Sequence, residues 1–214
     1  HVILPEAVTL GWGYPDAAMT SGTPEATIDA STAAATRATA TSRGSLGMWI
    51  FLAADAASFA ALLIAYAVLR ARAAAWPDAL ARLNLPLGGA LTYILLASST
   101  TMALAVGAAR AGRPPAVATR WLWATIALGA LFVAGQALEW RTLVAHGIGV
   151  ASDQAAASYY VCTGWHGAHV IAGLALLVTR RRAANDADKL AVAALFWHFV
   201  DAVWIVVFTS VYLA

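Results

Sequence analysis

Five long apolar stretches dominate the pattern of the chain, at about 45–69, 86–109, 121–140, 155–179 and 190–213. Each is close to the ~20 residues that an α-helix needs to cross a bilayer, at about 1.5 Å per residue. None shows the strict alternation of apolar and polar residues that is typical of a half-buried strand. Short segments with arginine, proline, glycine or aspartate separate the stretches. The pattern predicts an all-α membrane protein, a single bundle of five transmembrane helices.

The composition agrees with a protein that lies in the membrane. Hydrophobic residues make up 61% of the chain and charged residues 11%, against about 45–50% and about 25% in an ordinary soluble domain. The net charge of +2 and the lack of a basic stripe with interleaved aromatic residues give no indication of nucleic-acid binding. Cys162 is the single cysteine, which rules out an intrachain disulfide and a cluster of thiolate metal ligands.

Positive charges predict the orientation of the bundle, because arginine and lysine accumulate on the cytoplasmic side of a membrane protein. With the N-terminus inside, most of these residues fall on the inner side. The inner segments then hold Arg37, Arg43, Arg110, Arg113, Arg120, Arg180, Arg181, Arg182 and Lys189, whereas the outer loops hold Arg70, Arg72, Arg82 and Arg141. We therefore expect a cytoplasmic N-terminus and a C-terminus outside, on the periplasmic side.

Residues 1–43 differ in composition from the rest, because residues 22–42 are rich in alanine, threonine and serine. Such a composition buries too little apolar surface to fold alone. The start of the sequence lacks the basic-then-apolar pattern of a secretory signal peptide, and residues 1–10 are too short for a span. We expect an extended N-terminal arm over residues 1–43, ordered only against a partner, followed by the bundle over residues 44–214.

Seven histidine, acidic or amide side chains lie inside the predicted spans, where an unpaired charge is costly. Counted from the span ends, the inner half holds Asp55, His198 and Asp201, and the outer half holds Gln136, Glu139, His166 and His169. Most form pairs three residues apart, which lie on one face of a helix. The sequence predicts an inner and an outer polar cluster. Hydrogen bonding between helices is the simplest role for the histidines, and reaching toward the interface is the simplest for Glu139.

Histidines three residues apart also raise the alternative of a self-sufficient haem or metal enzyme. Haem between helices needs axial histidines at one depth, whereas His166 and His169 fall in one half of the bundle and His198 in the other. Glu139 with His166 or His169 is the one candidate metal site, with two or three ligands. We expect no haem, copper or iron on this chain, and no catalytic or metal-ligating residue.

Five motifs resemble one known family of membrane proteins. They are LGMW and the residues after it at 46–55, ASSTT at 97–101, QALEW at 136–140, TGWHGAHV within 160–170, and FWHFVDAVW at 196–204. Their order and spacing resemble subunit III of the haem–copper oxidases, the cytochrome c oxidase family, in its five-helix form. Asp55 stands where many members have a glutamate associated with modification by carbodiimide. An aspartate there also resembles the accessory proteins of nitric-oxide reductase.

The resemblance implies a subunit without haem or copper, in a respiratory terminal oxidase of the bacterial plasma (inner) membrane. In that family, subunit III packs against the catalytic subunit I in a complex with subunit II, and it binds phospholipids in a cleft between its helices. It also sustains proton uptake during electron transport to oxygen. Haem and copper then belong to the partner subunits. A quinol oxidase subunit III and an accessory subunit of nitric-oxide reductase are the alternatives within the family.

Overall fold

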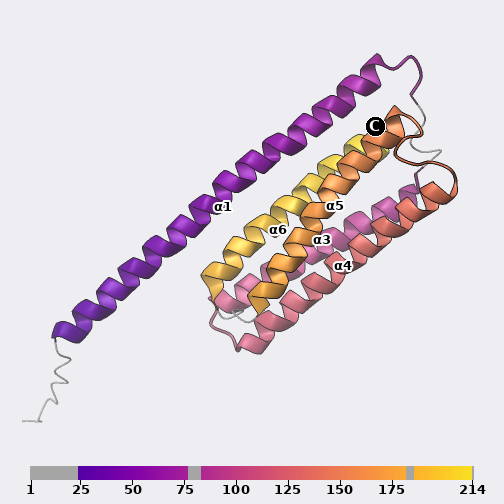
Figure 1. Cartoon of the computed structure of the whole chain (residues 1–214). Coiled ribbons are helices and arrows are strands. Elements are labelled where there is room, and N and C mark those ends of the chain that lie inside the picture. The colour runs from indigo at the N-terminus through magenta and orange to yellow at the C-terminus, as the bar shows by residue number, and fades with distance from the viewer. Residues whose placement is uncertain (1–23, 77–82, 182–185, 214) are drawn as a thin grey trace, which may run out of the picture. The chain divides into compact units, whose positions relative to one another are not determined.

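The fold is helical over the part of the chain that the computed structural model describes, residues 24–76, 83–181 and 186–213 (Figure 1). Five helices there are long and apolar enough to cross a membrane, which confirms the predicted class of fold. The chain divides into two units, residues 1–39 and 40–214. The helices are α1 (Pro24–Arg72), α3 (Leu85–Arg110), α4 (Pro115–Ala145), α5 (Gln154–Arg180), α6 (Ala187–Phe208) and a π-helical turn, η2 (Thr209–Leu213).

α1 begins at Pro24, so residues 24–43 are helical and do not form the extended arm expected from their composition. Proline is favoured at the start of a helix, because its missing N–H would have no intrahelical partner there. Alanine, the commonest residue of this segment, has the highest helix propensity and outweighs the polar threonines and serines. Residues 1–23 of the expected arm lie outside the described residues.

Polar caps fix where three of the helices begin. The side chains of Asn84, Asp153 and Asp186 accept hydrogen bonds from backbone N–H groups in the first turns of α3, α5 and α6, at 3.1, 2.8 and 3.1 Å. Each cap satisfies one of the N–H groups that have no intrahelical partner at the start of a helix.

Glycine ends α3 and α4 in the same way. Gly112 and Gly147 have positive φ angles of 61° and 78°, a conformation that residues with a Cβ atom rarely adopt. In both turns, the glycine N–H and the next N–H bond back to carbonyl groups in the last turn of the helix, as in a Schellman motif. α4 continues through Arg141 to this turn, so it is longer than the predicted span 121–140.

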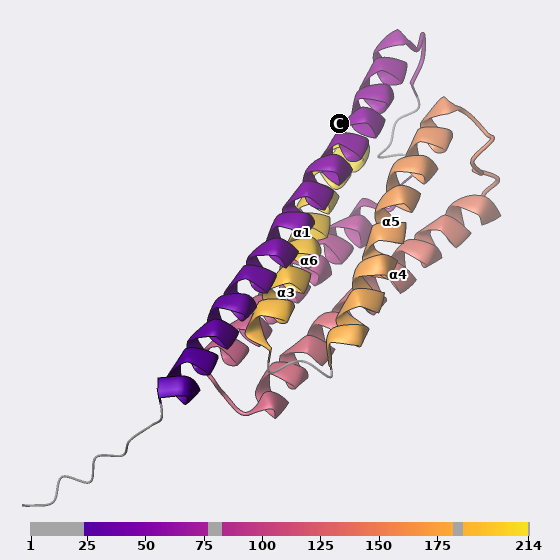
Figure 2. The ribbon, with the colours of Figure 1, turned by 60° about the vertical axis from the view of Figure 1, so that its left-hand side comes forward.

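Helices α3, α4, α5 and α6 pack in a ring, in which each has its most extensive contacts with two neighbours (Figures 1 and 2). α6 is the most enclosed of the spans: 56% of its most apolar window is buried within the protein, against 22% for α1. A helix that is apolar on all sides can lie in a protein core as well as in lipid, because no polar face of it needs water. The sequence of α6 therefore suits its position among the other helices.

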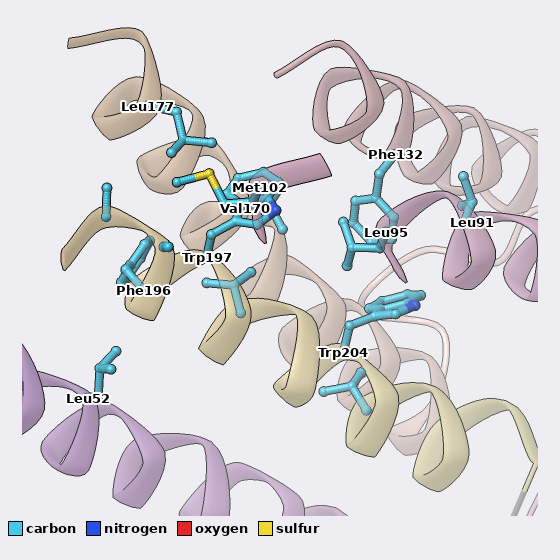
Figure 3. Packing of buried hydrophobic residues seen from close by; sticks show 14 of the residues in the cluster. Leu52, Leu91, Leu95, Met102, Phe132, Val170, Leu177, Phe196, Trp197 and Trp204 are labelled. Atoms are coloured by element: carbon cyan, nitrogen blue, oxygen red, sulfur yellow. The ribbon is translucent and has the colours of Figure 1, made fainter. Parts of the chain in front are cut away.

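Trp197 of α6 contacts the other three helices of this ring at one level. Its indole N–H donates to Ser98 of α3 at 3.0 Å. Its ring lies against Gly129 of α4 and Gly173 of α5, where an added Cβ atom would lie 2.5 and 3.0 Å from the nearest ring atom. Figure 3 shows Trp197 among the labelled side chains of the apolar core. The two glycines make room for the largest side chain at the centre of the bundle.

Candidate functional site

One ionisable pair connects α1 to α5. Asp55 Oδ1 lies 3.0 Å from His169 Nε2, and the two side chains are 8% and 13% exposed. Asp55 lies in the span Gly44–Arg72 and His169 in the span Gln154–Arg180, both near the middle. A short carboxylate at this depth cannot reach water, so it requires a partner of this kind.

The hydrogen bonds of His169 determine how many protons the pair holds. Its other ring nitrogen, Nδ1, lies 2.7 Å from the backbone oxygen of Trp165. A carbonyl oxygen only accepts, so Nδ1 carries a hydrogen. The contact between Nε2 and Asp55 then contains one proton, held either by the carboxyl or by the imidazole. The pair is neutral overall in both forms, which reduces the cost of burying it.

Aromatic rings and a serine enclose the pair. The rings of Phe59 and Trp165 both lie 5.1 Å from the His169 ring. The hydroxyl of Ser58 lies 2.7 Å from the Asp55 backbone oxygen and 3.3 Å from Oδ1, and it accepts from the Trp165 indole at 3.4 Å. Oδ2 of Asp55 has no hydrogen-bond partner within the described part of the chain. This favours the form in which Asp55 carries the proton, because a buried carboxylate needs donors at both oxygens.

Glu139 gathers donors from α4, α5, η2 and the start of α3. Oε1 accepts from the backbone N–H of Asn84 at 3.2 Å. Oε2 accepts from Gln136 at 3.3 Å, from the hydroxyl of Tyr159 at 3.0 Å, and from the hydroxyl of Tyr212. Four donors fit an ionised carboxylate. Only 2% of Glu139 is exposed, so its side chain stays inside the bundle. The expectation from its place near a span end, that the side chain reaches the interface, is wrong.

His198 and Asp201 lie one turn apart on α6 but differ in their partners. His198 Nδ1 lies 2.6 Å from the hydroxyl oxygen of Ser99 on α3. The Ser99 hydroxyl also lies close to the Asp201 carboxyl, but neither carboxyl oxygen accepts a hydrogen bond of ordinary geometry among the described residues. An ionised carboxylate without a donor is the most costly arrangement inside a membrane. The surroundings of Asp201 therefore suit its protonated form.

His166 is fully buried, and neither of its ring nitrogens has a hydrogen-bond partner in the described ranges. Its ring lies 4.9 Å from the ring of Trp204 and 5.6 Å from that of Phe132. The contacts of His166 are those of an aromatic packing residue.

These contacts divide the residues differently from the two expected layers. Asp55, expected beside His198 and Asp201, bonds to His169, which was expected in the other layer. His169 and Glu139 in turn belong to separate sites. The reason is the length of the helices: the spans contain 26 to 31 residues, so a residue about ten positions from one end lies near the middle rather than in one half.

Sequence reasoning did not single out Tyr159, Tyr212 or Ser99 as members of these sites. A tyrosine near a span end is a common interfacial anchor, and a serine within a span commonly serves close packing. One signal was available for Tyr212: together with Trp204 and Phe208 it repeats every four residues, the spacing of one helix face.

No three His, Cys, Asp or Glu side chains of the described ranges converge in a way that could hold a metal ion. Glu139 bonds to an amide, two tyrosines and a backbone N–H, and not to His166 or His169. The intramembrane polar residues instead link helices or pack between them. The fold and these sites define a multi-pass helical membrane protein whose intramembrane polar side chains serve contacts between its helices.

The chain belongs to the cytochrome c oxidase subunit III family, whose sequence model matches residues 24–214. This confirms the resemblance carried by the five motifs. The matched region begins at the first residue of α1 and contains all of the spans.

Curated bacterial relatives carry names of the same kind. The chain is 39% identical over 176 residues to a probable cytochrome c oxidase subunit 3 of Nocardia farcinica, covering 78% of this chain and 86% of the relative. It is 38% identical over 178 residues to a cytochrome c oxidase subunit 3 of Corynebacterium diphtheriae, with the same coverage. It is also 38% identical to a cytochrome bo(3) ubiquinol oxidase subunit 3 of Pseudomonas aeruginosa, covering 78% and 83% of the two chains.

Proposed function

We propose that this chain is the non-catalytic subunit III of a bacterial haem–copper terminal oxidase in the plasma membrane. The observation that carries the proposal is the family match over residues 24–214, which extends through every span. Relatives of similar identity are named as subunits of a cytochrome c oxidase and of a ubiquinol oxidase. The chain then supports a catalytic subunit I, beside a subunit II, and these partners hold the haem and copper that pass electrons to oxygen.

The arrangement of the polar side chains supports a structural role. Glu139 ties the outer ends of α4, α5 and η2 to the start of α3. Asp55 and His169 join α1 to α5. Interhelical hydrogen bonds of this kind fix the angles between helices inside a membrane, where the hydrophobic effect gives no preference for one arrangement.

Two arginines support an orientation with the N-terminus in the cytoplasm. Arg120, at the start of α4, and Arg181, at the end of α5, lie over the rings of Trp121 and Trp123 at 5.5 and 5.8 Å from the ring centroids. Tryptophan with arginine is typical of a membrane surface. The cytoplasmic leaflet is anionic and attracts such residues, so this end of the bundle is the inner end in our proposal.

Phospholipid is the proposed cover of α1. Large apolar side chains on this helix are widely exposed, among them Trp49 at 57%, Ile50 at 63% and Ile64 at 64%. A surface of this kind is stable only against acyl chains or another apolar protein surface. Acyl chains beside α1 would bring lipid next to the helix that carries Asp55.

Asp55 and His169 are proposed to sustain proton uptake by the catalytic subunit during turnover. The pair holds one proton in a buried position, and Asp55→Asn removes the group that can release it. Asparagine has nearly the same size and can donate its amide hydrogen to His169 Nε2, so the contact between α1 and α5 survives. We expect the Asp55→Asn complex to assemble and to consume oxygen initially at the wild-type rate, but to lose activity over fewer turnovers.

The experiment purifies the complex from native membranes through a tag on this chain and identifies its companions. Oxygen consumption is then followed over many turnovers at matched haem content. Ser99→Ala is the control variant, because it removes an intramembrane hydrogen bond of α6 without touching α1. Purification without haem- and copper-containing subunits contradicts the assignment to an oxidase. If the Asp55→Asn complex keeps its activity for as many turnovers as the wild type, Asp55 has a structural role alone. If it consumes no oxygen from the start, Asp55 lies directly on the proton path.

A further inference from the structure

Two tyrosines share one buried carboxylate at the outer end of the bundle. The hydroxyls of Tyr159 and Tyr212 both donate to Glu139 Oε2, and the two phenol oxygens lie 3.2 Å apart. We propose that these tyrosines are a redox-active pair, with Glu139 as the acceptor of the phenol proton. When this chain loses one electron, the radical that forms is finally located on one of these two tyrosines. Nothing in the structural role of subunit III requires this chemistry.

The charge at Glu139 favours the removal of an electron from a ring beside it. Its carboxylate receives four donors, as an ionised group requires, and none of them is a cation. The attraction between a negative charge and a nearby positive one is much larger in a poorly polarisable interior than in water. The positive charge that an oxidant creates on Tyr159 or Tyr212 is therefore stabilised by a carboxylate in direct contact.

The proton has a defined acceptor along an existing hydrogen bond. When an oxidant takes one electron from Tyr212, the phenol O–H bond breaks and its proton moves to Glu139 Oε2. The products are a neutral tyrosyl radical, a protonated Glu139 and the oxidant reduced by one electron. A base acts in this way only within hydrogen-bond reach of the proton it takes, and the same condition holds for Tyr159 at 3.0 Å.

Three other tyrosines of the described ranges lack such an acceptor. The Tyr66 oxygen accepts from the Arg70 guanidinium at 3.2 Å, a cation that opposes oxidation. The Tyr160 hydroxyl donates to the backbone oxygen of Ile148 at 2.9 Å, and an amide oxygen is a far weaker base than a carboxylate. Tyr93 is 77% exposed. The chain therefore offers its own controls.

A row of aromatic rings connects the pair to the centre and to the edge of the bundle. From the fully buried Trp204, the successive centroid distances through Tyr212, Tyr159, Tyr160 and Trp140 are 6.2, 5.9, 5.4 and 5.1 Å. Rings this close to one another exchange electrons readily, so an electron vacancy formed on either tryptophan can move to the pair. Among these five rings, only those of Tyr159 and Tyr212 have a hydrogen bond to a carboxylate within the described part of the chain.

The oxidants that this pair would intercept are one-electron oxidants such as radicals derived from partly reduced oxygen. The source of these radicals is the one part of the inference that rests on the proposed function, because an oxygen-reducing partner subunit would release such radicals nearby. The redox property itself belongs to this chain. It can be tested on the full chain without any partner, so its failure leaves the assignment to an oxidase untouched.

The test uses the full chain in lipid nanodiscs with a photoexcited ruthenium polypyridyl complex, quenched by an irreversible electron acceptor, as the oxidant. Samples are frozen after illumination and their electron paramagnetic resonance spectra are compared with those taken before it. The variants are Tyr159→Phe, Tyr212→Phe, the double variant and Glu139→Gln. The matched control is Tyr93→Phe. Circular dichroism and thermal unfolding establish that each variant is folded.

We expect a neutral tyrosyl signal in the wild-type chain, its yield unchanged in Tyr93→Phe and lost in the double variant. Each single tyrosine variant should keep part of the signal, and Glu139→Gln, which cannot take the proton, should lose most of it. The formation of the wild-type signal should also slow in deuterated buffer, because a proton moves with the electron. The deuterium measurement needs no variant. A wild-type spectrum of tryptophan radicals alone, or a signal that survives in the folded double variant, overturns the proposal.

Discussion

Replacing Gly129 by alanine tests the packing at the centre of the bundle. The added Cβ atom would lie 2.5 Å from Cη2 and 2.9 Å from Cζ2 of Trp197, and 2.9 Å from Cδ2 of Leu174. Carbon atoms in contact lie about 3.5–4.0 Å apart. The Trp197 ring has little freedom to move away, because its N–H is held by Ser98 and its other edge lies against Gly173.

The magnitude follows from two opposing effects. Overpacking of a tight core costs about 1–3 kcal/mol. Alanine in place of glycine in a helix interior returns up to about 1 kcal/mol. We expect Gly129→Ala to lower the free energy of unfolding by about 1–2 kcal/mol, which changes the unfolding equilibrium constant about tenfold.

Titration of SDS into mild detergent micelles, followed by circular dichroism, measures this free energy. Gly107→Ala is the matched control, because it makes the same substitution on α3 where an added Cβ meets nothing within 4 Å. It should unfold at the wild-type SDS concentration or higher. Trp197→Phe shortens the ring, so Gly129→Ala with Trp197→Phe should cost less than the sum of the two single losses. Equal stability of the two alanine variants, or additive losses in the double variant, refutes the packing argument.

The remaining predictions concern polar side chains and use the same titration. His166→Phe removes unpaired nitrogens from apolar surroundings and should leave the free energy of unfolding unchanged or raise it. His169→Phe deprives Asp55 of its partner and should lower the free energy of unfolding by about 1–3 kcal/mol. Equal decreases in the two variants contradict this distinction. Asp186→Ala removes the cap of α6 and should cost about 0.5–2 kcal/mol, and Asp186→Asn less, because asparagine still caps. The hydrogen bond from the Lys189 side chain lowers the pKa of Asp186. The contribution of this carboxylate is therefore complete above about pH 4 and is lost as the pH falls through the lowered pKa, which titrations at stepped pH measure.

The five spans could be predicted because length and apolar composition alone decide whether a helix can cross a membrane. Their ends were less predictable. Arg120 and Arg141 bounded the third predicted span, yet both lie within α4. An arginine can remain in a helix near the membrane surface, because its long side chain carries the charge back to water. A charged residue therefore marks the depth of the interface and not the end of the helix.

The pairing of Asp55 with His169 could not be predicted from the sequence, for a different reason. The two residues are 114 positions apart, and their meeting depends on the rotation of α1 and α5 about their axes as well as on depth. Rotation is set by the packing of whole helix faces. Depth counted from a span end carries an error of about one turn, or 5.4 Å, which is enough to place a residue in the wrong half of a bilayer about 30 Å thick.

Hydroxyl groups show why the partners of α6 were hidden in the sequence. Thr92 and Ser98 each donate to a carbonyl of their own helix, at 2.9 and 2.6 Å, so nothing in the sequence requires a partner for them. A hydroxyl oxygen that donates still accepts. Thr92 accepts from the indole of Trp204 at 2.9 Å, and Ser98 from that of Trp197 at 3.0 Å. A tryptophan indole N–H has no acceptor within its own helix, so each of these tryptophans donates to a hydroxyl that already donates elsewhere. The groups that require a partner are therefore the indole N–H groups of α6. Only the packed structure identifies which hydroxyls of the ASSTT motif and of the preceding turns of α3 accept from them.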